Sequence, residues 1–236
     1  MMKSWRILLA ILLLETNFAS ANIVVGNISF KPPFVTQEGG FDIDLMLIIC
    51  SRLNETCQFK PMMFPDLFDA LQEKKIDLAI GGITISPIRE TEYIFSYPYA
   101  VCRGQFLLLE EYGIHSIEEL FGSKIGVIRG TSLEDFLVHK FGDKFTLALF
   151  DSPMEVIAAL NNKEIKAAFL DQPLAVYWDQ HDGGKFILIG NPFLVGEGYG
   201  VMALPENAEL IEKINKVLLE IERDGTYLQL YSTYFE

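Results

Sequence analysis

The sequence lacks the motifs that mark most metal and catalytic sites. Its histidines are few, and none of the three (His115, His139 and His181) has a second His or a Cys at metal-ligand spacing. The H-E-x-x-H, G-x-S-x-G and phosphate-loop patterns are missing as well. We therefore predict a protein with no catalytic residues, no metal ion and no cofactor.

Positive charge is also scarce. The 236 residues include 19 Lys and Arg against 32 Asp and Glu, which gives a formal net charge of −13 at pH 7. A surface of this sign repels polyanions over long distances. The composition therefore excludes nucleic acid as a partner and disfavours anionic lipid surfaces.

Long apolar runs are missing too. A membrane-spanning helix needs roughly 20 apolar residues, and the apolar run at 7–14 is too short. That run follows two basic residues and precedes a small-x-small pattern at 19–21, as in a secretory signal. We expect residues 1–21 to be a signal peptide, with cleavage after Ala21 and export to the periplasm. A membrane anchor is the alternative.

Cysteine is limited to Cys50, Cys57 and Cys102. In an oxidising compartment a close pair should form a disulfide. Seven residues apart in one helix, Cys50 and Cys57 would be about 10 Å apart, too far to bond. A bridge becomes feasible if the helix stops at Leu53 and Asn54 and the chain turns back; otherwise the three thiols are free. We expect Cys102 to be buried in a strand.

Strand-like and helical patterns alternate along the rest of the chain, which predicts βαβ units with helices on both faces of mostly parallel sheets. The fold class is α/β. The expected strands are 23–28, 57–64, 76–80, 124–128, 145–150 and 166–170, and the expected helices are 41–53, 65–75, 131–141, 152–162 and 173–180.

Two long extended runs, 98–111 and 193–205, interrupt this alternation, and two helices end the chain. Extended runs that enclose a complete βαβ set predict two lobes joined by a two-strand hinge. We expect the first lobe to be discontinuous, 22–103 plus 198–236, and the second to be 104–197.

The carboxyl ends of strands in open α/β sheets are where ligands bind. In the first lobe this edge carries "GGITISPIRE" (81–90). Gly81 and Gly82 allow a ligand to approach the main chain, Thr84 adds a hydroxyl, and Arg89 offers a fork of donors suited to a carboxylate. The alternative is a glycine turn followed by a solvated arginine.

The second lobe carries a matching edge, "VIRGTSLEDF". Thr131 and Glu134 form a capping-box pattern, and the start of a helix favours an anion. Thr131 can equally serve only its own helix, and we expect Arg129 to lie on the surface. Asp171, directly after a strand, either caps the next helix or faces an ammonium group. We predict a receptor for a zwitterion from three groups taken together: Arg89, the backbone amides at the start of the helix that follows Gly130, and Asp171.

Aromatic residues follow two of the expected strands. Phe30, in "SFKPPF", and Phe64 can flank the aliphatic part of a ligand or belong to the core.

Several stretches resemble the polar amino-acid-binding proteins of ABC importers, the extracellular solute-binding protein family 3. They are "GGFDIDLMLIIC", "FPDLFDALQEKKIDLAIGGITISPIRETEYIFSYPYA", "KIGVIRGTSLEDF", "AAFLDQPLAVYW", "GEGYGVMAL" and "ERDGTYLQLYSTYF". The resemblance covers nearly the whole chain after the signal segment. It implies the two-lobe periplasmic binding protein fold of type II, which closes on one amino acid.

By position, the resemblance implies a role for each residue at the two edges. Arg89 and the amide of Thr131 or Ser132 would hold the ligand's carboxylate. Gly82, Thr84 and Asp171 would hold its ammonium group. Phe30 and Phe64 would enclose its side chain. The spacing of Cys50 and Cys57 also resembles that of the lysine/arginine/ornithine and histidine binders, which supports the bridge.

The sequence departs from the family pattern in two places. Ile28 and Ser29 stand where binders of cationic amino acids often have an acid, and Lys31 replaces the usual aromatic residue before "PPF". These departures weaken the case for a basic ligand, and whether Lys31 or Arg129 contacts the ligand stays open.

We expect a monomeric periplasmic protein that binds a free polar L-amino acid and delivers it to an ABC permease in the inner membrane. Arginine or lysine is weakly favoured over glutamine or glutamate. One alternative is a cyclohexadienyl or arogenate dehydratase on the same fold, for which Glu197 is a loose candidate acid. The other is a sensory ligand-binding module, although no kinase segment follows in this sequence.

Overall fold

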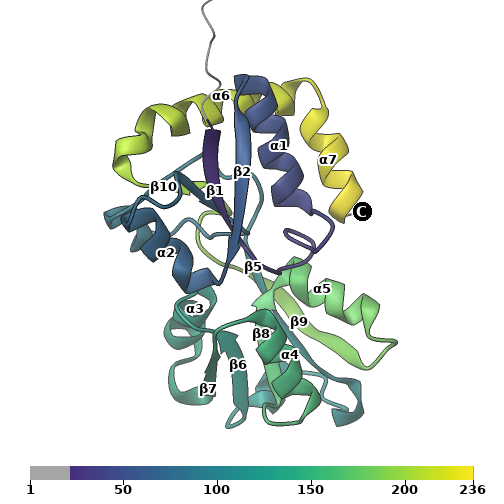
Figure 1. The fold of residues 1–236 in the computed structure, drawn as a ribbon. Coiled ribbons are helices and arrows are strands. Elements are labelled where there is room, and N and C mark those ends of the chain that lie inside the picture. Colours follow the sequence, from purple (N-terminus) through teal and green to yellow (C-terminus); the bar gives the residue numbers. More distant parts are fainter. Residues whose placement is uncertain (1–21, 236) are drawn as a thin grey trace, which may run out of the picture.

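The computed structural model describes residues 22–235, so the expected signal peptide and its cleavage site lie outside the described residues. Two five-stranded sheets form two lobes, one above the other in Figure 1. The first sheet has the order β2 (Thr56–Met62), β1 (Asn22–Ile28), β3 (Leu78–Ile80), β10 (Met202–Ala203), β4 (Ile94–Phe95). The second has the order β7 (Thr146–Phe150), β6 (Lys124–Ile128), β8 (Ala167–Asp171), β5 (Arg103–Leu109), β9 (Phe186–Leu194).

Helices flank both sheets (Figure 1). The first lobe contains α1 (Phe41–Leu53), α2 (Phe64–Gln72), α6 (Ala208–Arg223) and α7 (Thr226–Phe235); the second contains α3 (Ser132–Phe141), α4 (Pro153–Asn161) and α5 (Gln172–His181). Short 3-10 turns are η1 (Arg89–Thr91), η2 (Glu110–Tyr112), η3 (Ile117–Leu120), η4 (Gly142–Lys144) and η5 (Pro205–Asn207). The two-lobe α/β fold expected from the sequence is confirmed.

The sheets are mixed rather than mostly parallel. In each sheet two neighbouring strand pairs are parallel and two are antiparallel. The difference arises from the strands next to the lobe connections. β5 enters the second sheet between β8 and β9 and runs antiparallel to both. β9 itself was not expected as a separate strand, because Gly190 and Pro192 interrupt its apolar pattern.

Two crossing segments, 96–102 and 195–201, connect the sheets. They pair with each other: the Tyr99 N–H donates to the Tyr199 carbonyl at 2.9 Å, and the Tyr199 N–H donates to the Ala100 carbonyl at 2.8 Å. Cys102 is fully buried at the end of the first segment, directly before β5 and not within a strand. Of the expected lobe boundaries, the one after residue 103 falls one residue into β5 and the one after residue 197 falls within the second segment. Both stay predictions.

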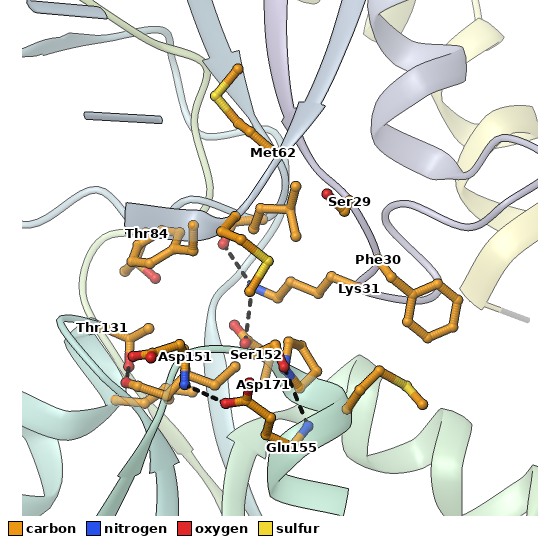
Figure 2. Close-up of a pocket in the computed structure, with 18 of the residues that line it drawn as sticks. Ser29, Phe30, Lys31, Met62, Thr84, Thr131, Asp151, Ser152, Glu155 and Asp171 are labelled. Atoms are coloured by element: carbon orange, nitrogen blue, oxygen red, sulfur yellow. Dashed lines mark hydrogen bonds and ion pairs between the residues drawn. The ribbon is translucent and has the colours of Figure 1, made fainter. Parts of the chain in front are cut away.

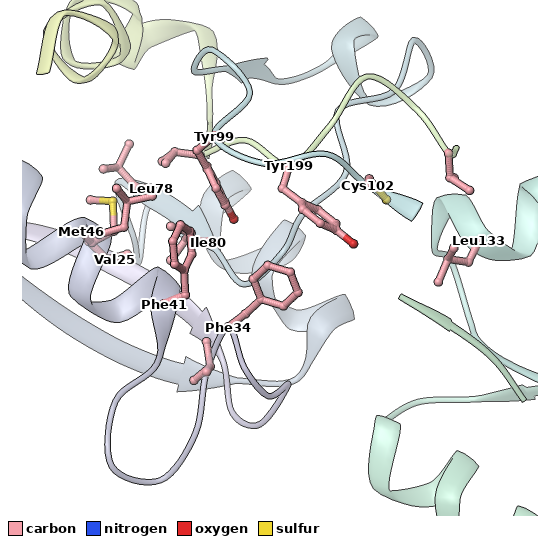
Figure 3. Packing of buried hydrophobic residues seen from close by; sticks show 14 of the residues in the cluster. Val25, Phe34, Phe41, Met46, Leu78, Ile80, Tyr99, Cys102, Leu133 and Tyr199 are labelled. Atoms are coloured by element: carbon pink, nitrogen blue, oxygen red, sulfur yellow. The ribbon is translucent and has the colours of Figure 1, made fainter. Parts of the chain in front are cut away.

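The core follows the period-two alternation of strand side chains. In β3, Leu78 and Ile80 pack with residues of α1, α6 and α7, whereas Ala79 packs with α2 on the other face. The larger cluster is continuous between the lobes. Figure 3 shows Phe34, Phe41 and Tyr199 within it, beside the first crossing segment.

The predicted disulfide between Cys50 and Cys57 is confirmed. Helix α1 ends at Leu53, and Asn54 takes the left-handed conformation with φ 57°. The chain therefore turns back into β2, which brings the two Cα atoms to 5.9 Å.

Asp42, in the first turn of α1, is a buried carboxyl group that joins three segments. Its Oδ2 accepts hydrogen bonds from the Gly82 N–H at 2.7 Å and from the Tyr99 hydroxyl at 2.9 Å. Burial raises its pKa to about 7, although these two bonds and nearby Lys31 oppose the shift. The loop after β3 and the first crossing segment are thus both attached to α1.

This carboxyl group should make stability depend on pH. Between the unfolded pKa of about 4 and the folded value near 7, the folded protein holds a proton that the unfolded chain has released. The contribution of Asp42 to the free energy of unfolding is therefore complete at low pH and is lost as the pH rises through about 7. The Asn side chain of Asp42→Asn cannot ionise. When the pH is raised from about 5 to about 8, the free energy of unfolding of this variant relative to the parent should therefore increase by roughly 1 kcal/mol or more.

Urea unfolding at the two pH values measures this change. Asp44→Asn, in the same helix turn, is the matched control and should show no comparable gain. An Asp42→Asn difference that is the same at both pH values would contradict the shifted pKa.

Candidate functional site

A cavity of about 380 Å³ lies between the lobes, at the edge where strands of both sheets end. The first lobe contributes Ile28, Ser29, Phe30, Lys31, Met62, Met63, Phe64, Gly82, Thr84 and Arg89; the second contributes Ile128, Thr131, Leu133, Asp151, Ser152, Pro153, Met154, Glu155 and Asp171. Figure 2 shows that polar side chains from both lobes point into the same space.

Most of the site residues predicted from the sequence meet here. Phe30, Phe64, Gly82, Thr84, Arg89, Thr131 and Asp171 line the cavity, and their roles in binding stay predictions. Gly81 and Ser132 are not among the lining residues. A Cβ atom at Gly81 would lie 2.7 Å from Ile28, so that glycine fits the chain closely against β1. Ser132 is the first residue of α3 and is buried.

Arg89 is a buried cation without a carboxylate partner. Only 9 % of the residue is exposed, and no ion pair of Arg89 occurs within residues 22–235. Its guanidinium donates to the Thr84 carbonyl at 2.8 Å and, across the cleft, to the Gly130 carbonyl at 3.1 Å. Burial lowers its pKa to about 10, so it stays charged at neutral pH. An anion is the ligand that this environment favours.

The start of α3 faces the same space. The Thr131 hydroxyl donates to the Ile128 carbonyl at 2.7 Å and accepts from the Glu134 N–H at 3.4 Å. The Glu134 carboxylate in turn accepts from the Gly130 N–H at 2.7 Å. Half of the capping box expected from the sequence is therefore present: the Thr131 side chain caps the Glu134 N–H, whereas the Glu134 carboxylate bonds to the residue before the N-cap. What remains for a ligand is the positive end of the helix.

Asp171 already has a cationic partner, which is Lys31. The Lys31 Nζ lies 2.9 Å from Asp171 Oδ2 and donates to the Gly82 carbonyl at 2.9 Å (Figure 2). The other Asp171 oxygen accepts from the Tyr199 hydroxyl at 2.6 Å. Asp171 makes no side-chain cap to α5. The ammonium group that it contacts in this structure is that of Lys31, and its role toward a ligand stays a prediction.

Sequence reasoning missed the wall formed by the start of α4. Asp151 and Glu155 line the cavity but are exposed, and the Asp151 N–H donates to Glu155 at 2.9 Å. Asp151 also pairs with Arg129 at 3.1 Å, which places Arg129 on the surface. The signal was present: Ser152 and Glu155 form a second capping-box pattern directly after β7, whose neighbour β6 supplies Ile128.

The two aromatic residues are placed differently. Phe64 opens α2 and lies under the Arg89 guanidinium, with 5.3 Å between its ring centroid and the Arg89 Cζ. Phe30 is half-buried, and Figure 2 shows its ring to one side of Lys31, pointing away from Thr84. Of the two aromatic residues, Phe64 is the one that contacts Arg89, a buried charged residue of the cavity.

Within residues 22–235, no group of three or more His, Cys, Asp or Glu side chains is placed to hold a metal ion. In the same part of the chain, no helix combines the length and the apolar content needed to cross a membrane.

Comparison with known proteins gives consistent results. A family model described as bacterial extracellular solute-binding proteins, family 3, matches residues 23–236. An arginine-binding periplasmic protein of Mannheimia haemolytica is 30% identical over 217 residues, which is 89% of each chain. A solved arginine transport-system periplasmic binding protein from Legionella pneumophila is 38% identical, with a TM-score of 0.87 over 92% of this chain and 100% of its own. An ancestral arginine-binding protein solved with glutamine is 35% identical, with a TM-score of 0.83 over 91% and 97%.

Because Lys31 and Asp171 form a buried ion pair, we expect the effects of substituting them on the free energy of unfolding to be strongly coupled. Lys31→Ala leaves the Asp171 carboxylate buried without its cation, and we expect a loss of about 3 kcal/mol in the free energy of unfolding. Adding Asp171→Asn removes the stranded charge and should recover a large part of that loss. Urea unfolding of the two single variants and the double variant measures the coupling. Additive losses would mean that the two side chains do not interact.

Proposed function

Since this chain belongs to the bacterial extracellular solute-binding proteins of family 3, we propose that it binds a small carboxylate of the amino-acid class between its lobes. We further propose that it acts as a monomer in the periplasm and delivers this ligand to an ABC permease in the inner membrane. The relatives reported above are binding proteins, and the curated one is named as periplasmic.

The observation that carries this proposal is the buried guanidinium of Arg89, which lies next to the N-terminus of α3 and has no carboxylate partner within residues 22–235. A guanidinium presents five N–H donors, and only two of its hydrogen bonds go to protein carbonyls. A carboxylate placed between Arg89 and the start of α3 would neutralise the cation and accept the remaining donors. Each charge-assisted hydrogen bond of this kind contributes roughly 1.5–3 kcal/mol.

The far wall of the cavity supports a polar or cationic group at the other end of the ligand. Asp151, Ser152 and Glu155 line this wall. A guanidinium or amide there would meet acceptor oxygens. This arrangement agrees with the names of the relatives, which refer to arginine, and with the ancestral protein solved with glutamine. A polar L-amino acid is the ligand class that these relatives support.

Closure of the two lobes on the ligand would link ligand binding to delivery to the permease. Two contacts cross the cleft, from Arg89 to Gly130 and from Lys31 to Asp171. A ligand that bonds to both sides favours the closed arrangement, which is a shift of population between open and closed states. The paired crossing segments are the place where the backbone would bend.

The dehydratase alternative receives no support from the position of Glu197. This residue lines a different cavity, behind the crossing segments, together with Tyr97 and Tyr227. The acids around the candidate cavity are Asp151, Glu155 and Asp171, and each of them already has a hydrogen-bond or ion-pair partner. We therefore propose binding without catalysis.

The test begins with a thermal-shift screen of the twenty L-amino acids and their 2-oxo or 2-hydroxy counterparts. A ligand at 100 times its dissociation constant stabilises the protein by about 2.7 kcal/mol. Arg89→Ala should then weaken the best ligand by about tenfold or more in titration calorimetry, because the carboxylate loses its cation.

Arg52→Ala is the matched control, because Arg52 forms an exposed ion pair with Asp224 that lies away from the cavity. It should bind like the parent protein. An Arg89→Ala variant that folds and binds with unchanged affinity would refute the role of Arg89.

A further inference from the structure

The tip of Lys31 lies where an ammonium group of a ligand would be expected. Asp171 and the Gly82 carbonyl are the anionic and neutral acceptors on that side of the cavity, and Lys31 Nζ bonds to both at 2.9 Å. We propose that Lys31 fills this ammonium position whenever the lobes are closed, so that the preferred ligand is a carboxylic acid that carries an oxygen in place of the 2-ammonium group. This inference rests on the carboxylate binding of the proposed function, and it replaces the amino acid as the preferred ligand with a 2-oxo or 2-hydroxy acid.

Lys31 is held in place by its surroundings. Its backbone N–H and carbonyl both bond to Val35, at 2.9 and 3.0 Å, around two prolines that restrict the turn. Its Nζ lies 5.4 Å from the ring centroids of both Phe34 and Tyr199. The residue is only 6 % exposed. Swinging it out would break two charge-assisted bonds and leave Asp171 buried without a cation.

Gly82 provides the space that the lysine tip fills. Its φ of +60° is a conformation that glycine adopts without strain. A Cβ atom at this position would lie 2.9 Å from Lys31 Nζ. The space beside Gly82 is therefore occupied by a group of the protein itself, and the role of Gly82 toward a ligand stays a prediction.

The charges around the cavity fit a monoanion better than a zwitterion. The buried charged side chains that line it are Lys31, Arg89 and Asp171, with a net charge of one positive unit. A carboxylate neutralises this excess at Arg89. The ammonium of an amino acid would meet a neutral ion pair in place of a free carboxylate, and its three donors would compete with those of Lys31.

An oxygen at the second carbon would instead find donors. An ammonium group has three N–H donors, and the bonds to Asp171 and Gly82 account for two of them at Lys31. The Thr84 hydroxyl, which also lines the cavity, lies 3.4 Å from the Cys102 sulfur, a weak hydrogen-bond partner. A ketone or hydroxyl oxygen can accept from both groups, which an ammonium cannot do.

The experiment compares matched pairs of ligands in titration calorimetry. The probes are L-arginine with its 2-hydroxy counterpart, L-glutamate with 2-oxoglutarate, and L-leucine with its 2-oxo counterpart. For the pair that binds, the parent protein should favour the acid without the 2-ammonium group by about tenfold or more. Lys31→Ala opens the ammonium position and should reverse this preference. If the alanine variant folds poorly, Lys31→Gln provides a second test. It keeps most of the side-chain volume but removes the charge, so the preference of the parent should be reduced.

Lys213→Ala is the control, because it removes a lysine that pairs with Glu209 on the exposed surface. It should keep the preference of the parent. If the parent binds the amino acid as tightly as its counterpart, and the Lys31 variants keep that ratio, the inference is overturned while the proposed function stands. If no probe binds to any variant, and the wider thermal-shift screen finds none, the proposed function fails, and the inference with it.

Discussion

The contact between Lys31 and Asp171 is the interaction on which the cavity depends. It crosses from one lobe to the other, it is almost completely shielded from water, and it makes one buried cation and one buried anion of the cavity neutralise each other. A buried pair of this kind is costly to break from one side, because the remaining charge has no solvent to stabilise it. The distribution of charge in the cavity therefore depends on a contact internal to the protein.

The backbone behind this contact is equally constrained. Asp42 accepts the Gly82 N–H while Lys31 bonds to the carbonyl of the same residue. A carboxyl group on one side and an ammonium on the other thus orient a single peptide segment at the end of β3. Because Tyr99 also donates to Asp42, the orientation of this loop is linked to the first crossing segment.

Residues that follow strand ends could be found from the sequence, because the carboxyl ends of parallel strands share one edge. Thr84, Arg89, Thr131 and Asp171 were placed together on this ground. The disulfide was feasible only if α1 stopped after Leu53, which it does, and the family resemblance supported it. The position of Lys31 could not be found in this way. It depends on a turn closed by Val35 and on the approach of the second lobe, and both are tertiary effects. The burial of Asp42 was hidden for a similar reason, since an acid in the first turn of a helix is usually solvated.

Tyr199 joins the cavity to the crossing segments within one residue. Its peptide group belongs to the paired crossing segments, whereas its hydroxyl bonds to Asp171 at the end of β8. A displacement of the Asp171 carboxylate would therefore break or redirect a hydrogen bond whose donor is carried by the crossing segments themselves.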